Sequence, residues 1–487
     1  MTREARLRRR ARGRRRSRRK ERGVALIMVL GALTVLTVML TEFQDQTSAE
    51  LGSALTERDA LKAEYAAKSA INLSRLLIAS EPTIRKALAP LFLLMRRGPP
   101  QIPVWQFADQ VLGAFNDKTG AEAFRLLAGV DVSEGKHLGL DGAGFEITIV
   151  DEDSKIDLNT AARGDAFSQA RLASQLSGLM LGPQYDSMFE NADPDGAHSD
   201  RQTICSAIVD WTDPDQDAYT CDPHSGTAQQ AGAEDSYYEM LKRPYQRKNA
   251  AFDSLEELRL VRGVGDDFWS TFIQPDPSNP DKRTVTVWGQ GKVNVNTANA
   301  QTLLAVICGN APAAPLCNDP LQASSFLSAV TMLRGFTMGA PLFSSTRGFV
   351  NTMKGTGPIG TVMAAVGLQP VVFLSDSETM KAITTESRVF SIYATGYVKA
   401  GKRETRVKVH AVVDFRGAPP PGMPNLGQLS SLGLLGSDGA TGPGGLGQSG
   451  ATEANPLAGL PADASSSAIV GALRPSAAGN IIYYRIN

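Results

Sequence analysis

Residues 20–40 read KERGVALIMVLGALTVLTVML, and this stretch decides how the chain is organised. Residues 24–40 carry no charge and only two polar side chains, Thr34 and Thr37. Seventeen residues is the lower limit for a helix that spans a bilayer, and it is too long for most core helices. No other apolar run in the chain is long enough. We therefore expect one membrane-spanning helix.

The charges on the two sides of this helix are very different. The 487-residue chain has 50 basic and 50 acidic side chains, so its formal net charge is zero. Residues 1–23 hold 13 basic and 2 acidic residues, which gives +11 there and −11 on the rest of the chain. By the positive-inside rule, the basic leader stays in the cytoplasm and the acidic body crosses. An acidic body does not favour nucleic-acid binding.

The N-terminal segment has three interpretations. A cleaved secretory signal needs a small-residue site after the apolar stretch, which residues 41–46 (TEFQDQ) do not provide. A plain signal anchor is the second interpretation. The third is cleavage by a prepilin peptidase, which recognises a charged leader ending in glycine directly before the apolar helix. Cleavage after Gly23 would leave Val24 as the new N-terminus.

The helix is expected to continue beyond the membrane. Residues 42–79 contain no proline and an approximate apolar stripe, and Pro82 is expected to end the helix. A helix over residues 24–79 would be about 84 Å long at 1.5 Å per residue. A helix half in the membrane and half packed on a domain has the lollipop shape of a pilin. The alternative is an anchor followed by a separate helix.

The body is predicted to combine a sheet with many helices. Residues 145–150 and 156–160 are expected to be strands joined by a turn, and residues 389–399 and 404–415 form a hairpin around residues 400–403. The sheet must therefore form from segments that are distant in sequence. Between them, helices are expected at residues 169–181, 201–212, 237–241, 255–262, 300–307 and 321–334.

One short pattern occurs twice. Residues 156–161 (IDLNTA) and 293–298 (VNVNTA) both place Asn-Thr-Ala between a strand and a helix. In the first copy, Asn159 and Thr160 are expected to cap a helix that begins near Ala161. The repetition suggests two related helical modules, although the similarity is too short to prove duplication.

The C-terminal region changes character. Residues 417–479 contain 14 glycines and 8 prolines, so we expect a flexible tail without a core. The chain then ends in the apolar residues 481–486. These residues are either a disordered end or an edge strand that returns to the sheet.

The strongest candidate for a metal site is an acidic loop. Residues 210–235 contain seven carboxylates and no lysine or arginine. Carboxylates at every second loop position suit a hard cation such as Ca²⁺, although the glycine and final glutamate of an EF-hand are missing. The alternative is a solvated acidic loop with helix caps. The expected ligands are Asp213, Asp215, Asp217, Glu234 and Asp235.

The four cysteines fall into two close pairs, Cys205 with Cys221 and Cys308 with Cys317. No C-x-x-C sequence occurs, so a zinc site is not expected. Local pairs suit two small-loop disulfides in an oxidising compartment, and the first would clamp the acidic loop. Four buried thiols are the alternative.

No catalytic motif stands out. The four histidines are scattered, and the chain lacks a nucleophile elbow and a phosphate-binding glycine loop. Residues 258–265 resemble one helix-hairpin-helix turn, which we interpret as a structural hairpin. We therefore expect a protein that is not an enzyme.

Several stretches together resemble protein K of the bacterial type II secretion system, a minor pseudopilin. They occur in the right order, whereas the long arginine leader and the Gly/Pro-rich tail depart from the family pattern. The matching stretches are residues 22–26, 151–159, 209–213, 232–238, 244–245, 248–249, 254–263 and 293–297.

This resemblance implies an α+β fold: a long N-terminal transmembrane helix, a pseudopilin-like antiparallel sheet and a large all-α insertion. It implies a methylated N-terminus after processing by prepilin peptidase, an inner-membrane anchor and a periplasmic body. It also implies a place at the pseudopilus tip with minor pseudopilins I and J, and through them the major pseudopilin. Calcium near the acidic loop is implied as well.

Met28 bears on the expected position in the fibre. Most pilins have glutamate at the fifth mature position, where its carboxylate pairs with the N-terminal amine of the subunit above. An unpaired charge in lipid is costly, so this pair sets the register. Met28 cannot pair upward, which fits a tip subunit. The alternative is that Met28 is only another lipid-facing residue of an anchor.

The expected organisation follows from these observations. Two other functions remain: a minor pilin of a type IV pilus or DNA-uptake machine, and a membrane-anchored, calcium-dependent periplasmic hydrolase. The expected regions are a cleaved leader (1–23), a transmembrane segment (24–40), the periplasmic half of the long helix (41–80), the first segment of the pseudopilin α/β domain (81–160), a helical insertion (161–385, interrupted by a strand within 285–296), the β-hairpin (386–416), the tail (417–479) and the apolar end (480–487).

Overall fold

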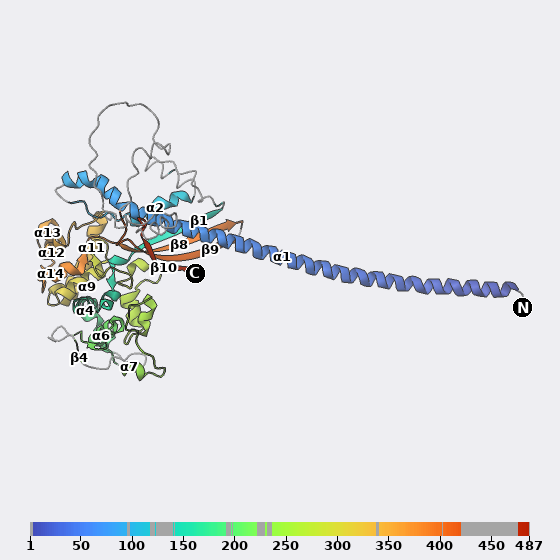
Figure 1. Cartoon of the computed structure of the whole chain (residues 1–487), viewed down its shortest axis with the longest axis horizontal. Coiled ribbons are helices and arrows are strands. Elements are labelled where there is room, and N and C mark those ends of the chain that lie inside the picture. Colours follow the sequence, from blue (N-terminus) through green and yellow to red (C-terminus); the bar gives the residue numbers. More distant parts are fainter. Residues whose placement is uncertain are drawn as a thin grey trace, which may run out of the picture.

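The computed structural model shows a long N-terminal helix whose C-terminal part lies along one side of the rest of the protein (Figure 1). The sheet lies against this helix, and the other helices gather beyond the sheet (Figure 1). The structure describes residues 3–94, 98–116, 122, 140, 142–190, 196, 198–221, 229–230, 236–337, 340–401, 403–419 and 476–486.

Helix α1 spans Arg3–Leu94 and includes both the basic leader and the apolar stretch. The prediction that Pro82 ends this helix is wrong, because the helix continues past it. A proline removes one backbone hydrogen bond, but other contacts can hold the next turn. Glu81 makes such contacts: its carboxylate accepts hydrogen bonds from Arg85 at 2.8 and 3.0 Å and from the backbone N–H of Ile102 at 2.9 Å.

A four-stranded antiparallel sheet forms from distant segments, as predicted. Its strands occur in the order β1 (Ala143–Asp151), β8 (Val389–Ala400), β9 (Arg403–Asp414) and β10 (Asn480–Ile486). Strands β8 and β9 form the predicted hairpin, in which Ala400 pairs with Arg403. The apolar C-terminal segment is the returning edge strand: β10 pairs with β9, and Asn480 lies opposite Asp414.

The C-terminal half of α1 packs closely on this sheet. A Cβ atom at Gly396 of β8 would lie only 1.9 Å from the carbonyl oxygen of Ala63, so no larger residue fits there. A row of buried alanines on α1 allows this approach: Ala63, Ala66, Ala67 and Ala70. Larger side chains complete the core beside them, among them Ile71, Ile78, Trp105, Phe390 and Phe415.

The helical body lies between β1 and β8 in the sequence and has its own large hydrophobic core. Its longer helices are α4 (Ala166–Met180), α6 (Arg201–Thr212), α9 (Ala300–Asn310), α11 (Pro320–Phe336), α12 (Thr346–Met353) and α13 (Gly357–Ala365). Its shorter helices are α5 (Asp186–Glu190), α7 (Ser236–Glu239), α8 (Asp266–Phe268), α10 (Pro315–Asn318) and α14 (Asp376–Ala382).

Short strands and 3-10 turns complete the body. Two pairs of two-residue strands are parallel, β2 with β5 and β6 with β7, and β3 pairs antiparallel with β4. Their bounds are β2 (Ile156–Asp157), β3 (Ala218–Tyr219), β4 (Gln229–Gln230), β5 (Val285–Thr286), β6 (Val293–Asn294) and β7 (Ile383–Thr384). The 3-10 turns include η1 (Val104–Phe107), η4 (Glu152–Ser154), η5 (Leu158–Arg163), η7 (Leu255–Leu260) and η9 (Pro280–Lys282), and α2 (Ala108–Leu112) follows η1.

Some predicted boundaries are wrong. Asn159 and Thr160 do not cap an α-helix, because they belong to the 3-10 turn η5. Helix α4 begins later and is capped by Asp165, whose carboxylate accepts from the backbone N–H of Ser168 at 2.9 Å. The helix expected at residues 255–262 is the 3-10 turn η7. Helices α12 to α14 were not predicted.

Helices α4 and α9 pass very close to each other. A Cβ atom at Gly178 of α4 would lie 2.0 Å from the carbonyl oxygen of Ala305, and one at Gly309 of α9 would lie 2.2 Å from that of Ser174. Glycine on both helices therefore lets the two backbones touch, and this contact joins the regions that follow the two Asn-Thr-Ala sequences.

Candidate functional site

The expected processing residues lie on α1. Gly23 is within the helix, and Val24 and Met28 after it expose 51% and 66% of their surface. Within the described part of the chain, the segment Val24–Pro90 is the one helix long and apolar enough to cross a membrane. Its apolar window is not covered by any other part of the protein. This surface needs another environment, and a bilayer provides one.

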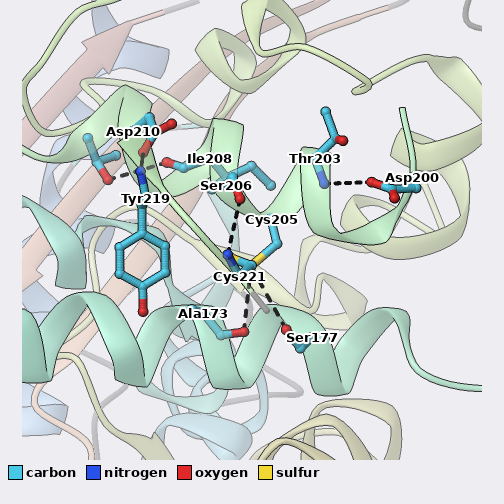
Figure 2. Close-up of a disulfide and its surroundings, with 11 residues drawn as sticks. Ala173, Ser177, Asp200, Thr203, Cys205, Ser206, Ile208, Asp210, Tyr219 and Cys221 are labelled. Carbon is cyan, nitrogen blue, oxygen red and sulfur yellow. Dashed lines mark hydrogen bonds between the residues drawn. A yellow bond between two sulfur atoms is a disulfide. The ribbon is translucent and has the colours of Figure 1, made fainter. Parts of the chain in front are cut away.

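Both cysteine pairs form disulfides in the structure. Cys205 on α6 is bonded to Cys221, with 6.0 Å between their Cα atoms, and Cys308 on α9 is bonded to Cys317, with 5.5 Å. Figure 2 shows the first disulfide lying over α4, where the sulfur of Cys205 is 3.7 Å from the carbonyl oxygen of Ala173. This disulfide thus ties the middle of the acidic loop to α6, and the bond lies against α4.

Hydrogen bonds shape the start of the acidic loop. Figure 2 shows Cys221 and Tyr219 reaching back to α6: the N–H of Cys221 donates to Ser206 Oγ at 3.2 Å, and that of Tyr219 to Asp210 Oδ1 at 2.7 Å. Asp210 therefore has a structural role in closing the loop. The loop backbone is held on both sides of the three expected ligands, Asp213, Asp215 and Asp217.

Asp213 and Asp215 lie together at this site. The side-chain amide of Gln169 on α4 donates to Asp213 Oδ2 at 3.1 Å and to Asp215 Oδ2 at 3.4 Å. Asp213 is fully buried, whereas Asp217 is exposed and joins the group through its backbone N–H, which donates to Asp215 Oδ1 at 2.9 Å. Glu234 and Asp235 lie outside the described residues.

Burial changes the charge state of this cluster. Burial, and then the charge of Asp215, raise the pKa of Asp213 from 3.8 to about 7. Burial also raises the pKa of Asp210 to about 7. Arg247 opposes both shifts, but burial lowers its own pKa. Asp213 and Asp210 are therefore partly protonated near pH 7, and their full ionisation requires a further positive charge nearby.

Two buried oxygen atoms at this site make no hydrogen bond within the described residues: Asp213 Oδ1 and Asn249 Oδ1. Asn249 has a left-handed backbone with φ of 48°, and its amide nitrogen donates to the carbonyl oxygen of Asp215 at 3.4 Å. A hard cation such as Ca²⁺ is coordinated by oxygen atoms, and buried oxygens without a hydrogen bond are available as ligands. No three acidic, histidine or cysteine side chains among the described residues form a complete metal-binding group.

Sequence reasoning missed Gln169 and Asn249 as members of this cluster. Both lie far from the acidic loop in sequence, and amide residues are less conspicuous than carboxylates. The pair Lys248-Asn249 belonged to the stretches that resemble the pseudopilin family, which was the one signal for this cluster in the sequence.

A second cluster joins the sheet to the helical body. It was predicted as a simple turn, but its acidic side chains are buried. Asp151 accepts hydrogen bonds from the hydroxyls of Ser387 and Thr297, both at 2.5 Å. Asp153 accepts from the backbone N–H of Gln290 at 2.9 Å and of Arg388 at 2.6 Å. These contacts connect the end of β1 to the start of β8.

The charges of this junction are also perturbed. Burial raises the pKa of Asp151 to about 6. Glu152 differs, because Lys155 and two hydroxyl groups outweigh the burial and lower its pKa. Lys155 is itself buried and lies 3.2 Å from Glu152. The junction is therefore a packed polar network, which is expensive to break once its partners are in place.

The two Asn-Thr-Ala sequences form the same structure. Asn159 Oδ1 accepts from the backbone N–H of Phe252 at 2.7 Å, and its amide donates to the Phe252 carbonyl at 3.0 Å. Asn296 makes the same pair with Phe343, at 2.9 Å for each bond. Each asparagine therefore bridges to a backbone segment far away, instead of capping a helix.

Comparison with known protein families gives one match. Residues 154–272 match the family model described as "Type II secretion system (T2SS), protein K". This segment contains the Asn159 bridge, the Cys205–Cys221 disulfide and the acidic loop. A comparison with curated proteins gives no match.

One similar solved structure is a chain of the GspK-GspI-GspJ complex from the type 2 secretion system of enterotoxigenic Escherichia coli. It has 14% sequence identity and a TM-score of 0.36, and the similarity covers 76% of this chain and 94% of that chain. Residues 154–272, about a quarter of the chain, are thus similar to protein K of the type II secretion system.

Proposed function

We propose that this protein is a minor pseudopilin that acts at the tip of the type II secretion pseudopilus. There it helps to initiate and cap assembly of the fibre that exports folded proteins across the outer membrane. It is anchored in the inner membrane by residues 24–40 and has its body in the periplasm, and it is not an enzyme. The observation that carries this proposal is the protein K match in a body attached to one long, exposed apolar helix.

The N-terminal helix supports processing by prepilin peptidase. Gly23 directly precedes the exposed apolar surface that begins at Val24. Cleavage after Gly23 removes the +11 leader and leaves a helix that can leave the bilayer sideways into a fibre. A polycation left in the cytoplasm would instead hold the subunit in the membrane.

Met28 supports a terminal position. It is exposed on α1 and has no charge with which to pair an N-terminal amine above it. A subunit inside the fibre would leave the amine above it unpaired in an apolar environment, at considerable cost. A subunit with nothing above it avoids this cost, so Met28 fits the tip.

The proposed partners are minor pseudopilins I and J, which connect this subunit to the major pseudopilin. The support is the match of residues 154–272 to protein K, because a tip subunit of that kind needs neighbours below it in the fibre. Prepilin peptidase is the proposed processing partner.

N-terminal sequencing of the membrane-bound protein tests the processing step. The expected sequence begins at Val24 with a methylated amine, and the matched variant Gly23→Val is expected to begin at Met1. A wild-type start at Met1, or within residues 41–50, would contradict the proposal.

A secretion assay tests the tip position separately. In a strain lacking this gene, the wild-type chain should restore export, whereas Met28→Glu should reduce it because the new carboxylate seeks a partner above. Met39→Glu provides a control for charge in the same apolar segment. Equal export by wild type and Met28→Glu would argue against the terminal position.

We also propose that Ca²⁺ binds beside the acidic loop. Asp213, Asp215 and Asn249 would hold it, with Glu234 and Asp235 as further candidates. The unsatisfied oxygens of Asp213 and Asn249 support this, as does the raised pKa of Asp213. A bound cation would neutralise part of the charge and stiffen the loop that Cys205–Cys221 closes.

Calorimetry of the full chain in detergent tests the calcium site. Ca²⁺ at 100 times its Kd should stabilise the fold by about 2.7 kcal/mol. Binding should weaken between pH 8 and pH 5.5, because Asp213 and Asp210, with pKa values of about 7, take up protons in that range. Asp213→Asn should abolish binding, and the exposed control Asp267→Asn should not. Absence of both heat and thermal stabilisation in the wild type would remove the site.

A further inference from the structure

A groove of about 580 Å³ follows the outer edge of β1. Its floor is residues 146–149 of β1. One wall comes from η1 and α2, with Trp105 and Asp109, and the other from the segment containing Asn279 and Asp281. The groove therefore lies between the part of the protein that packs on α1 and the helical body.

On the side of β1 away from β8, part of the backbone along this groove has no hydrogen-bond partner among the described residues. The N–H and C=O of Phe145 point away from β8 and bond to the side chain of Asn116, at 2.9 and 2.6 Å. Backbone groups in a strand alternate in direction with a period of two. Those of Ile147 and Ile149 therefore point the same way, and they make no hydrogen bond within the described residues. The N–H of Ala143 donates to the carbonyl oxygen of Leu140, and Asn116 covers Phe145, so only the start of this edge has partners.

Two features that commonly protect an edge strand, proline and lysine, are missing from β1. Its sequence, AGFEITIVD, contains no proline and no lysine, and it is rich in β-branched residues. A free edge of this kind is a template for another strand, and most proteins block it. Retention of a free edge beside a groove indicates that the edge is used.

The groove has a strongly acidic lining. Four carboxylates line it and no lysine or arginine does. Two of them have partners: Glu146 pairs with Arg406 at 3.2 Å, and Asp151 accepts the hydroxyl bonds described above. The other two, Asp109 and Asp281, form no ion pair within the part of the chain that the structure describes. Lys155 and Arg334 act on Asp281 electrostatically, but neither lines the groove.

We propose that the free edge of β1 and its acidic groove are a docking site for an extended segment of another protein that carries lysine or arginine. The segment adds a fifth strand beside β1 through the backbone groups of Ile147 and Ile149, in the manner of β-augmentation. Its basic side chains face Asp109 and Asp281. This proposal is independent of the secretion assignment.

The charge argument favours another protein over this chain itself. The nearest candidate in the chain is residues 117–140, which lie between α2 and β1 in sequence. They carry four acidic and three basic residues, so they do not complement an acidic groove. The other edge strand, β10, carries Arg485 but is already paired with β9.

The test uses the full chain in detergent at 150 mM salt and two fluorescent ten-residue peptides. One alternates valine with lysine, and the other alternates valine with glutamate. The lysine peptide should bind at least tenfold more tightly, and it should slow hydrogen exchange in residues 145–151. Asp109→Asn with Asp281→Asn should weaken its binding about tenfold. Glu239→Gln with Asp267→Asn removes the same charge elsewhere and should leave binding unchanged.

Several outcomes would overturn the proposal. Equal binding of the two peptides, equal loss in the control variant, or no slowing in residues 145–151 would each do so. Slow exchange at this edge in the free monomer, relieved by deleting residues 119–138, would show that the chain covers the edge itself. Slowing that grows with protein concentration and accompanies dimers would assign the edge to a second copy. If the double variant misfolds, Asp109→Asn alone, an exposed change, gives the same comparison.

Discussion

The helical body contains two regions built on the same plan, which differ in what has been added. In the first module, the Asn159 bridge leads to α4 and α6; in the second, the Asn296 bridge leads to α9 and α11. Each bridge follows a two-residue parallel strand pair, and each module contains one disulfide. Only the first has the acidic loop, and there Asp157 occupies the position that Asn294 occupies in the second.

The difference separates the framework that both modules share from the proposed calcium site. The bridge, the short strand pair and the disulfide occur in both modules, so they belong to the framework. The carboxylates of the loop and Asp157 occur only in the first module, which is also the region that the protein K family model matches. Substituting corresponding residues in the two modules, and comparing the effects on stability and on calcium binding, tests this distinction.

The largest effect is expected at the bridges. Asn159→Ala or Asn296→Ala leaves a distant backbone N–H and C=O without partners, at roughly 1–3 kcal/mol for each group and about 4 kcal/mol in total. Urea unfolding of the full chain in detergent measures this loss. Asn318→Ala, at an exposed position, should cost less than about 1 kcal/mol. If Asn159→Ala lowered the free energy of unfolding strongly and Asn296→Ala hardly at all, the two bridges would not be equivalent.

The disulfides should rank next. Their cysteines are 16 and 9 residues apart, so replacing either pair with serine should cost about 3 kcal/mol, slightly more for the longer loop. Thermal unfolding of the two double variants tests this. Only loss of Cys205–Cys221 should also weaken calcium binding in calorimetry. If loss of either disulfide weakened calcium binding equally, the calcium site would not belong to the first module alone.

The contact between the modules should be sensitive to a single methyl group. Gly178→Ala and Gly309→Ala each force α4 and α9 apart, at about 2 kcal/mol for overpacking. Because the two glycines meet at one contact, the double variant should cost less than the sum of the single variants. Strict additivity in urea unfolding would show that the helices move independently.

The smallest expected effect is on the pH dependence of stability. Asp157 in the first module can titrate, whereas the corresponding Asn294 in the second cannot. Burial raises the pKa of Asp157 from 3.8 to about 6. The protonated form therefore stabilises the fold fully below pH 3.8, and this contribution is lost as the pH rises through 6. Asp157→Asn should gain on the order of 1–2 kcal/mol over the wild type between about pH 4.5 and pH 8. Parallel stability curves for the two proteins would contradict the raised pKa.

The sequence predicted those parts of the fold that depend on local patterns. The hairpin of β8 and β9 has regular alternation and a glycine turn, and the apolar stretch of α1 is long enough to identify by itself. Pro82 misled the prediction because Glu81 and its partners hold the helix beyond it. Helices α12 to α14 are short and gain their stability from the shared core, so local patterns were weak.

The candidate site was predicted only in part, for a similar reason. Asp213 and Asp215 were visible as closely spaced carboxylates, but Gln169 and Asn249 reach them only after the chain has folded. Asn159 and Asn296 were noticed as a repeated sequence and interpreted as caps. Their true partners, Phe252 and Phe343, are too distant in sequence for local reasoning to identify.

The pairing of Asn480 with Asp414 brings together the two ends of the segment between β9 and β10. Arg75 of α1 secures the returning end by donating to the carbonyl oxygens of Ala478 and Gly479, at 2.9 and 2.8 Å. Doubling the length of a segment closed in this way costs only about 0.6 kcal/mol of loop entropy. The chain between Asp414 and Asn480 can therefore be lengthened or shortened at little cost in folding free energy. A reporter domain can be inserted there for the same reason.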